Sequence, residues 1–300
     1  MNRTNVFYEE RHFNYERGIA HLCVERFMVV LYDDILPLCG RLGQESREQI
    51  TSLTIEYIRS LQFSLEKQKK RVSDNKLLHD ATQSFPLHRL TDEQRKWPRH
   101  PYVLLLEMID LLHGFSDCDE IVLSRLLYYH EKLKPCEPGQ RDRNNILEST
   151  TICQAKIDVP KIVSWGGSVP CKSLKKPYIN GMMARGIFHK CIKEAIQVAM
   201  AAEESIKVKL QVVSSGKVFS TAYQLKRAWG KTRLQHLKFP CVSLVPPCTQ
   251  CQQIYPTVKY HPSPTDHRPA LWPFGNCAEN YAFSRLINKA GASVIRPSTF

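Results

Sequence analysis

Acidic residues are scarce in the second half of this 300-residue chain. From residue 205 to the end there are 13 Lys and Arg but only two acids, Asp266 and Glu279. Residues 161–300 carry 20 basic against 5 acidic residues, whereas residues 1–160 carry 22 against 24. A half this basic suggests a polyanionic partner such as nucleic acid, a nucleotide or another phosphorylated ligand, although a merely soluble basic surface explains the charge equally well. Any acid in this half becomes a candidate for a specific role.

Other patterns are missing, and each absence removes a class of protein. No stretch approaches roughly 18 uninterrupted apolar residues, so we expect no membrane-spanning helix and no membrane partner. The 11 cysteines are an odd number, and the first residues do not resemble a secretory signal. We therefore expect an intracellular protein, cytoplasmic or nuclear, whose thiols are free or bind metal. G-x-x-x-x-G-K-[ST], G-x-G-x-x-G and G-x-S-x-G do not occur, so a phosphate-cradling loop and a hydrolase nucleophile have no support.

Residues 1–134 have the pattern of an all-α helical domain. Capping-box signals begin at Ser46 and Thr91, and apolar residues at helical spacing follow each of them. Two prolines delay the next helix until about Tyr102, and Asp117 is a candidate cap for a fourth. The leucine and aromatic stripes are typical of a core. This half shows no chemical motif, so it is a candidate for binding a protein partner.

The second half predicts a different architecture. Residues 135–179 are rich in turn formers, including the glycine turn SWGGS, and are expected to be an irregular linker. Residues 180–300 predict an α/β domain with a mixed sheet and helices, so that the whole chain is an α+β two-domain protein. The expected elements are a helix, a β-hairpin and a buried strand, at 181–205, 206–223 and 241–245.

Cys248 and Cys251 form a C-x2-C pair behind Pro246 and Pro247. Pro247 suits the start of a helix, and Pro256 would end that helix after little more than a turn. A C-x2-C on a first helical turn offers two thiolates on one side, as a tetrahedral Zn²⁺ site requires. Alone, the pair is a weak signal.

A second segment completes the pattern. Asn276 is a candidate N-cap and Gly291 a candidate stop for a helix whose first turn holds Cys277 and Glu279. A third thiolate and a rare carboxylate thus share one helix start.

P-C-x2-C and C-x-E, each opening a helix, resemble the zinc signature of the cytidine deaminase superfamily. The resemblance covers about residues 180–290. It implies that Cys248, Cys251 and Cys277 bind Zn²⁺ and that Glu279 is the catalytic acid and base without being a ligand. It also implies hydrolytic deamination of a cytosine- or adenine-type base in a nucleotide or nucleic acid. The order of the two motifs is the reverse of the family's usual order.

Two other interpretations remain open. His261, His267 or Cys241 could supply a fourth ligand, which would make a closed structural zinc site in a non-catalytic domain that binds nucleic acid or protein. Alternatively, the three thiols are buried without metal and Glu279 only complements the helix dipole. The lone cysteines of the helical patterns are expected to be small buried residues: Cys23, Cys39, Cys118 and Cys191.

Aromatic and basic residues are interleaved around the two motifs. Such residues stack on bases and pair with phosphates, although each aromatic residue is by itself more typical of a core. The set comprises Trp229, Tyr255, Tyr260, Trp272 and Phe274 with Lys226, Arg227, Lys231, Arg233 and Arg268.

Overall fold

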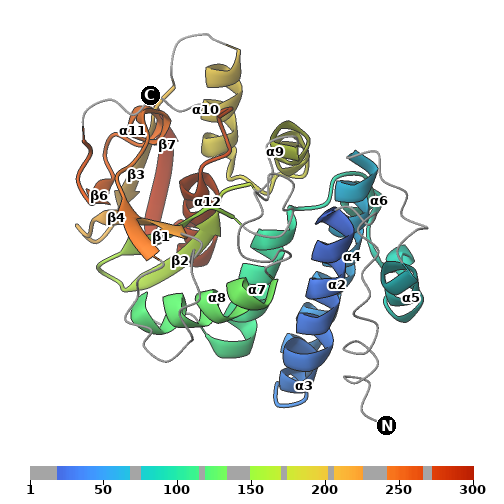
Figure 1. Cartoon of the computed structure of the whole chain (residues 1–300). Coiled ribbons are helices and arrows are strands. Elements are labelled where there is room, and N and C mark those ends of the chain that lie inside the picture. Colours follow the sequence, from blue (N-terminus) through green and yellow to red (C-terminus); the bar gives the residue numbers. More distant parts are fainter. Residues whose placement is uncertain are drawn as a thin grey trace.

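The computed structural model describes residues 19–67, 76–114, 119–133, 149–169, 174–201, 206–225, 242–265 and 272–300 (Figure 1). Helices come first, and a mixed sheet with further helices follows, which confirms the predicted α+β class. The N-terminal elements are α2 (Ile19–Val30), the π-helical turn η1 (Leu31–Ile35), α3 (Leu36–Cys39), α4 (Gln44–Lys67), α5 (Lys76–Ser84), the 3-10 turn η3 (Leu87–Arg89), α6 (Asp92–Lys96), α7 (Pro101–His113) and α8 (Asp119–Leu133).

Local signals placed several of these helices correctly. Thr91 caps α6, because its hydroxyl accepts the Gln94 N–H at 3.2 Å while the Gln94 side chain accepts the Thr91 N–H at 2.9 Å. The predicted capping box is therefore confirmed. Pro101 occupies the first turn of α7, where its missing N–H costs nothing. Helix α4 begins at Gln44, slightly before the signal at Ser46, and Asp117 lies outside the described residues.

The C-terminal part contains β1 (Thr151–Ile157), β2 (Ile162–Gly167), α9 (Lys175–Ala184), α10 (Lys190–Met200), β3 (Val208–Val212), β4 (Val218–Leu225), β5 (Val242–Val245), α11 (Thr249–Ile254), β6 (Lys259–His261), α12 (Ala278–Ala290) and β7 (Ile295–Thr299). The main sheet has the order β2-β1-β4, and both β5 and β6 pair with the free side of β4. Strand β5 is antiparallel to β4 and β6 is parallel to it. After β5 the chain leaves this side of β4, forms α11, and returns to the same side of β4 as β6.

The predicted hairpin of residues 206–223 is wrong in its pairing. Both segments are strands, as their alternation indicated, but β3 pairs with β7 in a separate two-stranded sheet. Strand β4 pairs with β1 instead, with Val218 opposite Ile157. Alternation shows that a segment is extended, whereas its partner depends on contacts far away in the chain. Strand β5 is also not buried: it is an edge strand whose Leu244 is 45% exposed.

The expected irregular segment 135–179 contains two strands. β1 and β2 form an antiparallel hairpin, and the turn formers from Asp158 to Lys161 connect them. The buried side chains of Cys153, Ala155 and Trp165 explain why these strands belong to the core. The predicted domain boundaries themselves stay a prediction.

The expected single helix 181–205 is two helices. Helix α9 ends at Ala184 and α10 begins at Lys190. Between them Gly186 has φ +66°, a left-handed conformation that a glycine adopts without strain.

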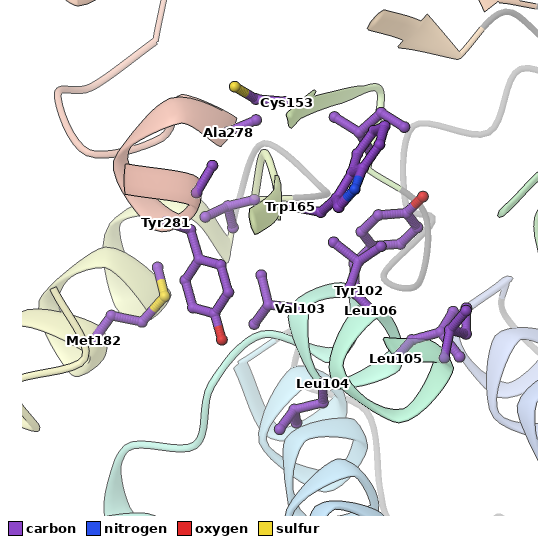
Figure 2. Close-up of a cluster of buried hydrophobic side chains, with 14 of the residues drawn as sticks. Tyr102, Val103, Leu104, Leu105, Leu106, Cys153, Trp165, Met182, Ala278 and Tyr281 are labelled. Carbon is purple, nitrogen blue, oxygen red and sulfur yellow. The ribbon is translucent and has the colours of Figure 1, made fainter. Parts of the chain in front are cut away.

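The segment SWGGS is not a turn but the end of β2, where α12 packs on the sheet. A Cβ atom added to Gly166 would lie 2.6 Å from the backbone nitrogen of Ala282, which is closer than real contacts allow. Glycine at this position therefore lets α12 lie directly against the strand. Figure 2 shows Ala278 and Tyr281 of α12 in the same buried cluster as Trp165 of β2 and Tyr102 of α7. Among the described residues, this hydrophobic core runs through both halves of the chain.

A buried ion network also joins the helical half to α12. Arg99 lies between Glu56 of α4 and Glu107 of α7, at 2.9 and 2.7 Å. Arg185 pairs with Glu56 as well, and the Tyr281 hydroxyl of α12 donates to Glu107. Farther along α12, two basic side chains pair with Asp110 of α7: Arg285 at 3.2 Å and Lys289 at 3.0 Å. The helix that carries Cys277 is therefore fixed against the N-terminal helices.

Candidate metal centre

Cys248 occupies the N-cap position of α11, directly after the two prolines that follow β5. Its φ and ψ of −73° and 164° are extended, so the first helical residue is Thr249 and Pro247 lies outside the helix. The predicted short helix is confirmed, and its start is two residues later than Pro247. The turn of the helix brings Cys251 back toward Cys248.

Cys277 occupies the equivalent position at the start of α12. It is the N-cap residue, one position after the predicted Asn276, and Gly291 ends the helix with φ +70° as predicted. The first N–H groups of a helix have no carbonyl partners within it, so the start of α12 favours negative charge nearby. Both motifs therefore place a cysteine where a helix begins.

The three sulfurs converge on one point. Cys248 Sγ lies 3.6 Å from Cys251 Sγ and 3.4 Å from Cys277 Sγ, and all three lie within 4.8 Å of one another. A zinc ion about 2.3 Å from each of three tetrahedral thiolates needs sulfurs about 3.8 Å apart. The three cysteines are free thiols at nearly this spacing, so the cluster could hold a metal ion such as zinc.

The three thiols share their charge unequally. Hydrogen bonding with Cys251 and Cys277 lowers the pKa of Cys248 well below its usual value, although burial opposes this shift. Contact with Cys248 is in turn the main reason why the pKa values of Cys251 and Cys277 are raised. The cluster alone thus concentrates negative charge at Cys248, because a second thiolate would be repelled. A divalent cation would remove this repulsion and favour three thiolates.

Glu279 lies in the first turn of α12 and is 4% exposed. Burial raises the pKa of its carboxyl group to about 7, and the charge at Cys248 acts in the same direction, while its own backbone and the Cys251 side chain lower it. Within the described part of the chain, Glu279 is not a member of the three-sulfur group. The structure thus places a buried carboxyl group beside the three thiols and outside their group.

A fourth sulfur lies deeper in the sheet. Cys153 of β1 is fully buried, and its Sγ lies 3.3 Å from Ser220 Oγ of β4. Burial raises the pKa of Cys153, and the charge of Glu279 raises it further. No local pattern marks Cys153, because it belongs to β1, a strand in the segment that was expected to be irregular.

Three aromatic residues in or near the two cysteine segments donate hydrogen bonds at or near the cluster. Trp272 Nε1 donates to Cys277 Sγ at 3.2 Å, and Tyr260 donates its hydroxyl hydrogen to the Cys251 carbonyl oxygen at 2.9 Å. Tyr255 is fully buried behind α12 and donates to Asn280 Oδ1 at 2.7 Å. The sequence pattern suggested stacking on bases or core packing for these aromatic residues, and did not predict hydrogen bonds to the cysteine segments. Their contacts with the site depend on geometry that no local pattern encodes.

One of the other candidate ligands, His261, belongs to the described residues, and it is not brought to the site. His261 lies exposed at the end of β6 and does not belong to the sulfur group. Cys241 and His267 lie outside the described residues, as do six of the aromatic and basic candidates: Trp229, Lys226, Arg227, Lys231, Arg233 and Arg268. Of the lone cysteines, Cys39 and Cys191 are only half-buried, which corrects the expectation that they are core residues, and the side chains of Cys23 and Cys118 are outside the description.

No protein-family model matches the chain, and no curated protein or solved structure matches it either. None of the described helices is both long and apolar enough to cross a membrane.

Proposed function

We propose that the protein is a zinc-dependent hydrolytic deaminase that acts on a cytosine- or adenine-type base of a nucleotide or nucleic acid. One observation carries the proposal. Three cysteine sulfurs from two helix starts converge, and the buried Glu279 lies two residues after one of them without joining the group. Three soft ligands and a separate acid are what this chemistry requires.

Each part has a distinct role. Zinc bound by Cys248, Cys251 and Cys277 would supply hydroxide near neutral pH, because coordination lowers the pKa of water from about 15.7 to about 7. Glu279 carries the first proton of the attacking water to the ring nitrogen, and then carries the second proton, from the hydroxyl group that has added to the carbon, to the departing amine. The C–NH2 group becomes a carbonyl, and ammonia leaves. Since Glu279 and Cys277 share the first turn of α12, a single helix start directs ligand and acid to the same place.

The reversed motif order does not oppose this chemistry. A site depends on where its side chains meet, and here the starts of α11 and α12 bring the sulfurs together whichever helix comes first in the chain. The pairing of β5 and β6 with β4 explains how the two helix starts meet. Strand β5 leads into α11, and β6 returns the chain to β4 before α12.

The basic character of the second half favours a phosphorylated substrate. Near the cluster, Lys175 Nζ lies 5.6 Å from the centre of the Trp272 ring, and this pairs a cation with an aromatic face. In proteins that bind single-stranded nucleic acid, basic side chains contact the phosphates and aromatic rings stack on the bases.

The alternative is a non-catalytic zinc domain, or an inactive deaminase fold, that binds nucleic acid or protein. The low exposure of Cys251 and Cys277, 1% and 8%, is the observation that favours it, because a structural site needs no access for a substrate.

Metal content and ammonia release distinguish these functions. The purified wild type should contain zinc, and Cys248→Ala and Cys277→Ala should lose it. Glu279→Gln should keep the zinc yet release no ammonia from cytidine and adenosine nucleotides or from single-stranded oligonucleotides. Zinc without ammonia release in the wild type selects the non-catalytic domain. If neither cysteine substitution changes the zinc content, both the deaminase and the non-catalytic zinc domain are overturned.

A further inference from the structure

Trp272 connects the two segments that carry the cysteines. Its indole N–H donates to Cys277 Sγ at 3.2 Å, so the contact is made to one of the three candidate ligand atoms themselves. Its backbone carbonyl accepts a hydrogen bond from Gln250 Nε2 at 2.9 Å, and Gln250 lies between Cys248 and Cys251 on α11. One residue is thus bonded to α11 through its backbone and to the start of α12 through its side chain.

The position of the Trp272 ring is fixed by further contacts. Lys175 of α9 lies 5.6 Å from the ring centre, and the ring is half-buried. Gln250 is 9% exposed, so its amide group has little freedom to exchange the Trp272 carbonyl for water. The donor therefore approaches the sulfur in a defined geometry before any ligand arrives.

We propose that Trp272 is a positioning residue of the metal centre, whose indole N–H orients the Cys277 thiolate and stabilises its bond to zinc. The inference rests on the proposed zinc site, but not on the proposed deamination. An indole N–H can only donate, so it favours the negatively charged sulfur over a neutral thiol. Side chains that hydrogen-bond to metal ligands orient them, and removing such partners typically costs about 10- to 100-fold in metal affinity.

The chain offers a matched control for this proposal. Trp97 is also half-buried, and it also has a lysine near its ring, with Lys96 Nζ at 5.7 Å from the centre. It lies in the helical half, where its backbone carbonyl accepts a hydrogen bond from Arg185. Replacing either tryptophan with phenylalanine keeps an aromatic ring and removes one N–H, but only one of the two donors contacts a sulfur.

The test measures metal binding by Trp272→Phe, Trp97→Phe and the wild type. Zinc affinity is obtained by competition with a chromophoric chelator, and the folded state is checked by circular dichroism. We expect Trp272→Phe to bind zinc about tenfold or more weakly and Trp97→Phe to bind it like the wild type. With Co²⁺ in place of zinc, Trp272→Phe should also shift the sulfur-to-cobalt charge-transfer band to lower energy, because the hydrogen bond stabilises the sulfur electrons.

A second variant covers the case in which Trp272→Phe does not fold. Gln250→Leu removes the bond that holds the Trp272 carbonyl and should also weaken zinc binding, whereas Gln253→Leu, at an exposed position of the same helix, should not. Unchanged zinc affinity and an unchanged cobalt spectrum in Trp272→Phe overturn the inference, as does an equal loss in Trp97→Phe. If Trp272→Phe does not fold, equal zinc affinities of Gln250→Leu and Gln253→Leu overturn the inference. A wild type that binds zinc but releases no ammonia contradicts the deaminase proposal alone.

Discussion

Glu56 gives a stability prediction that can be worked out from the structure. Its carboxylate is 1% exposed and pairs with both Arg99 and Arg185. Burial alone would raise its pKa, but the two guanidinium groups outweigh burial and lower the pKa to about 2 from an ordinary value of 4.5. A difference of about 2.5 units at about 1.4 kcal/mol per unit makes the ionised form worth about 3 kcal/mol to the folded state.

The sign follows from the lowered pKa. Above pH 5 the carboxylate is ionised in both states, and its full contribution to the free energy of unfolding is present. As the pH falls toward 2, the unfolded chain binds a proton first, so the contribution shrinks to about 1 kcal/mol near pH 3. Acidification should therefore reduce the advantage of the wild type over Glu56→Gln.

Urea unfolding of the wild type and Glu56→Gln, followed by circular dichroism between pH 7 and pH 3, measures this difference. We expect Glu56→Gln to be less stable by about 3 kcal/mol at pH 7, and the gap to narrow on acidification. Glu66→Gln is the control, because Glu66 pairs with Arg59 at 2.9 Å but is 47% exposed, and such pairs contribute about 0–1 kcal/mol. A gap that is independent of pH, or equal for both variants, would refute the reasoning.

Three further predictions concern packing and the metal. Gly166→Ala should lower the free energy of unfolding by about 2 kcal/mol or more, because the added Cβ would meet the backbone of α12. Gly43→Ala is the control and should not lower it, since nothing lies within 4 Å of a Cβ at that position. Urea titration of the two variants measures the difference. Tyr255→Phe should cost about 1–3 kcal/mol by the same measurement, because it leaves the buried Asn280 amide oxygen without its donor, and a cost near zero would contradict that bond. Removing zinc with a chelator should lower the melting temperature, since an ion present at about 100 times its dissociation constant adds about 2.7 kcal/mol; an unchanged melting temperature would argue against a bound metal.

Local chemistry made part of the fold predictable. The capping box at Thr91, the proline at the start of α7 and the glycine at the end of α12 act within a few residues, so the sequence around each is sufficient. The same is true of the two cysteine motifs, because each lies on one helix start.

Partners in space were not predictable in this way. β3 pairs with a strand more than eighty residues further along the chain, and nothing in its alternation of apolar and polar residues specifies that choice. Gly166 shows the same limit: two glycines in a row are typical of a turn, and only the packing of α12 shows why this strand needs a residue without a side chain. The hydrogen bond from Trp272 to Cys277 belongs to this group, because loop geometry determines where an indole N–H points.

The ion network between α7 and α12 has a practical consequence for expressing parts of the protein. A fragment that begins after the helical half would retain Tyr281, Arg285 and Lys289 but lose Glu107 and Asp110, and would expose the apolar surface that Tyr102 covers on β2. Arg285 and Lys289 would then lack their acidic partners on α7, and apolar surface on β2 would be uncovered beside α12, the helix that begins after Cys277. The N-terminal helices therefore help to hold α12 in place, and an assay of the C-terminal fragment alone would test a molecule without these contacts.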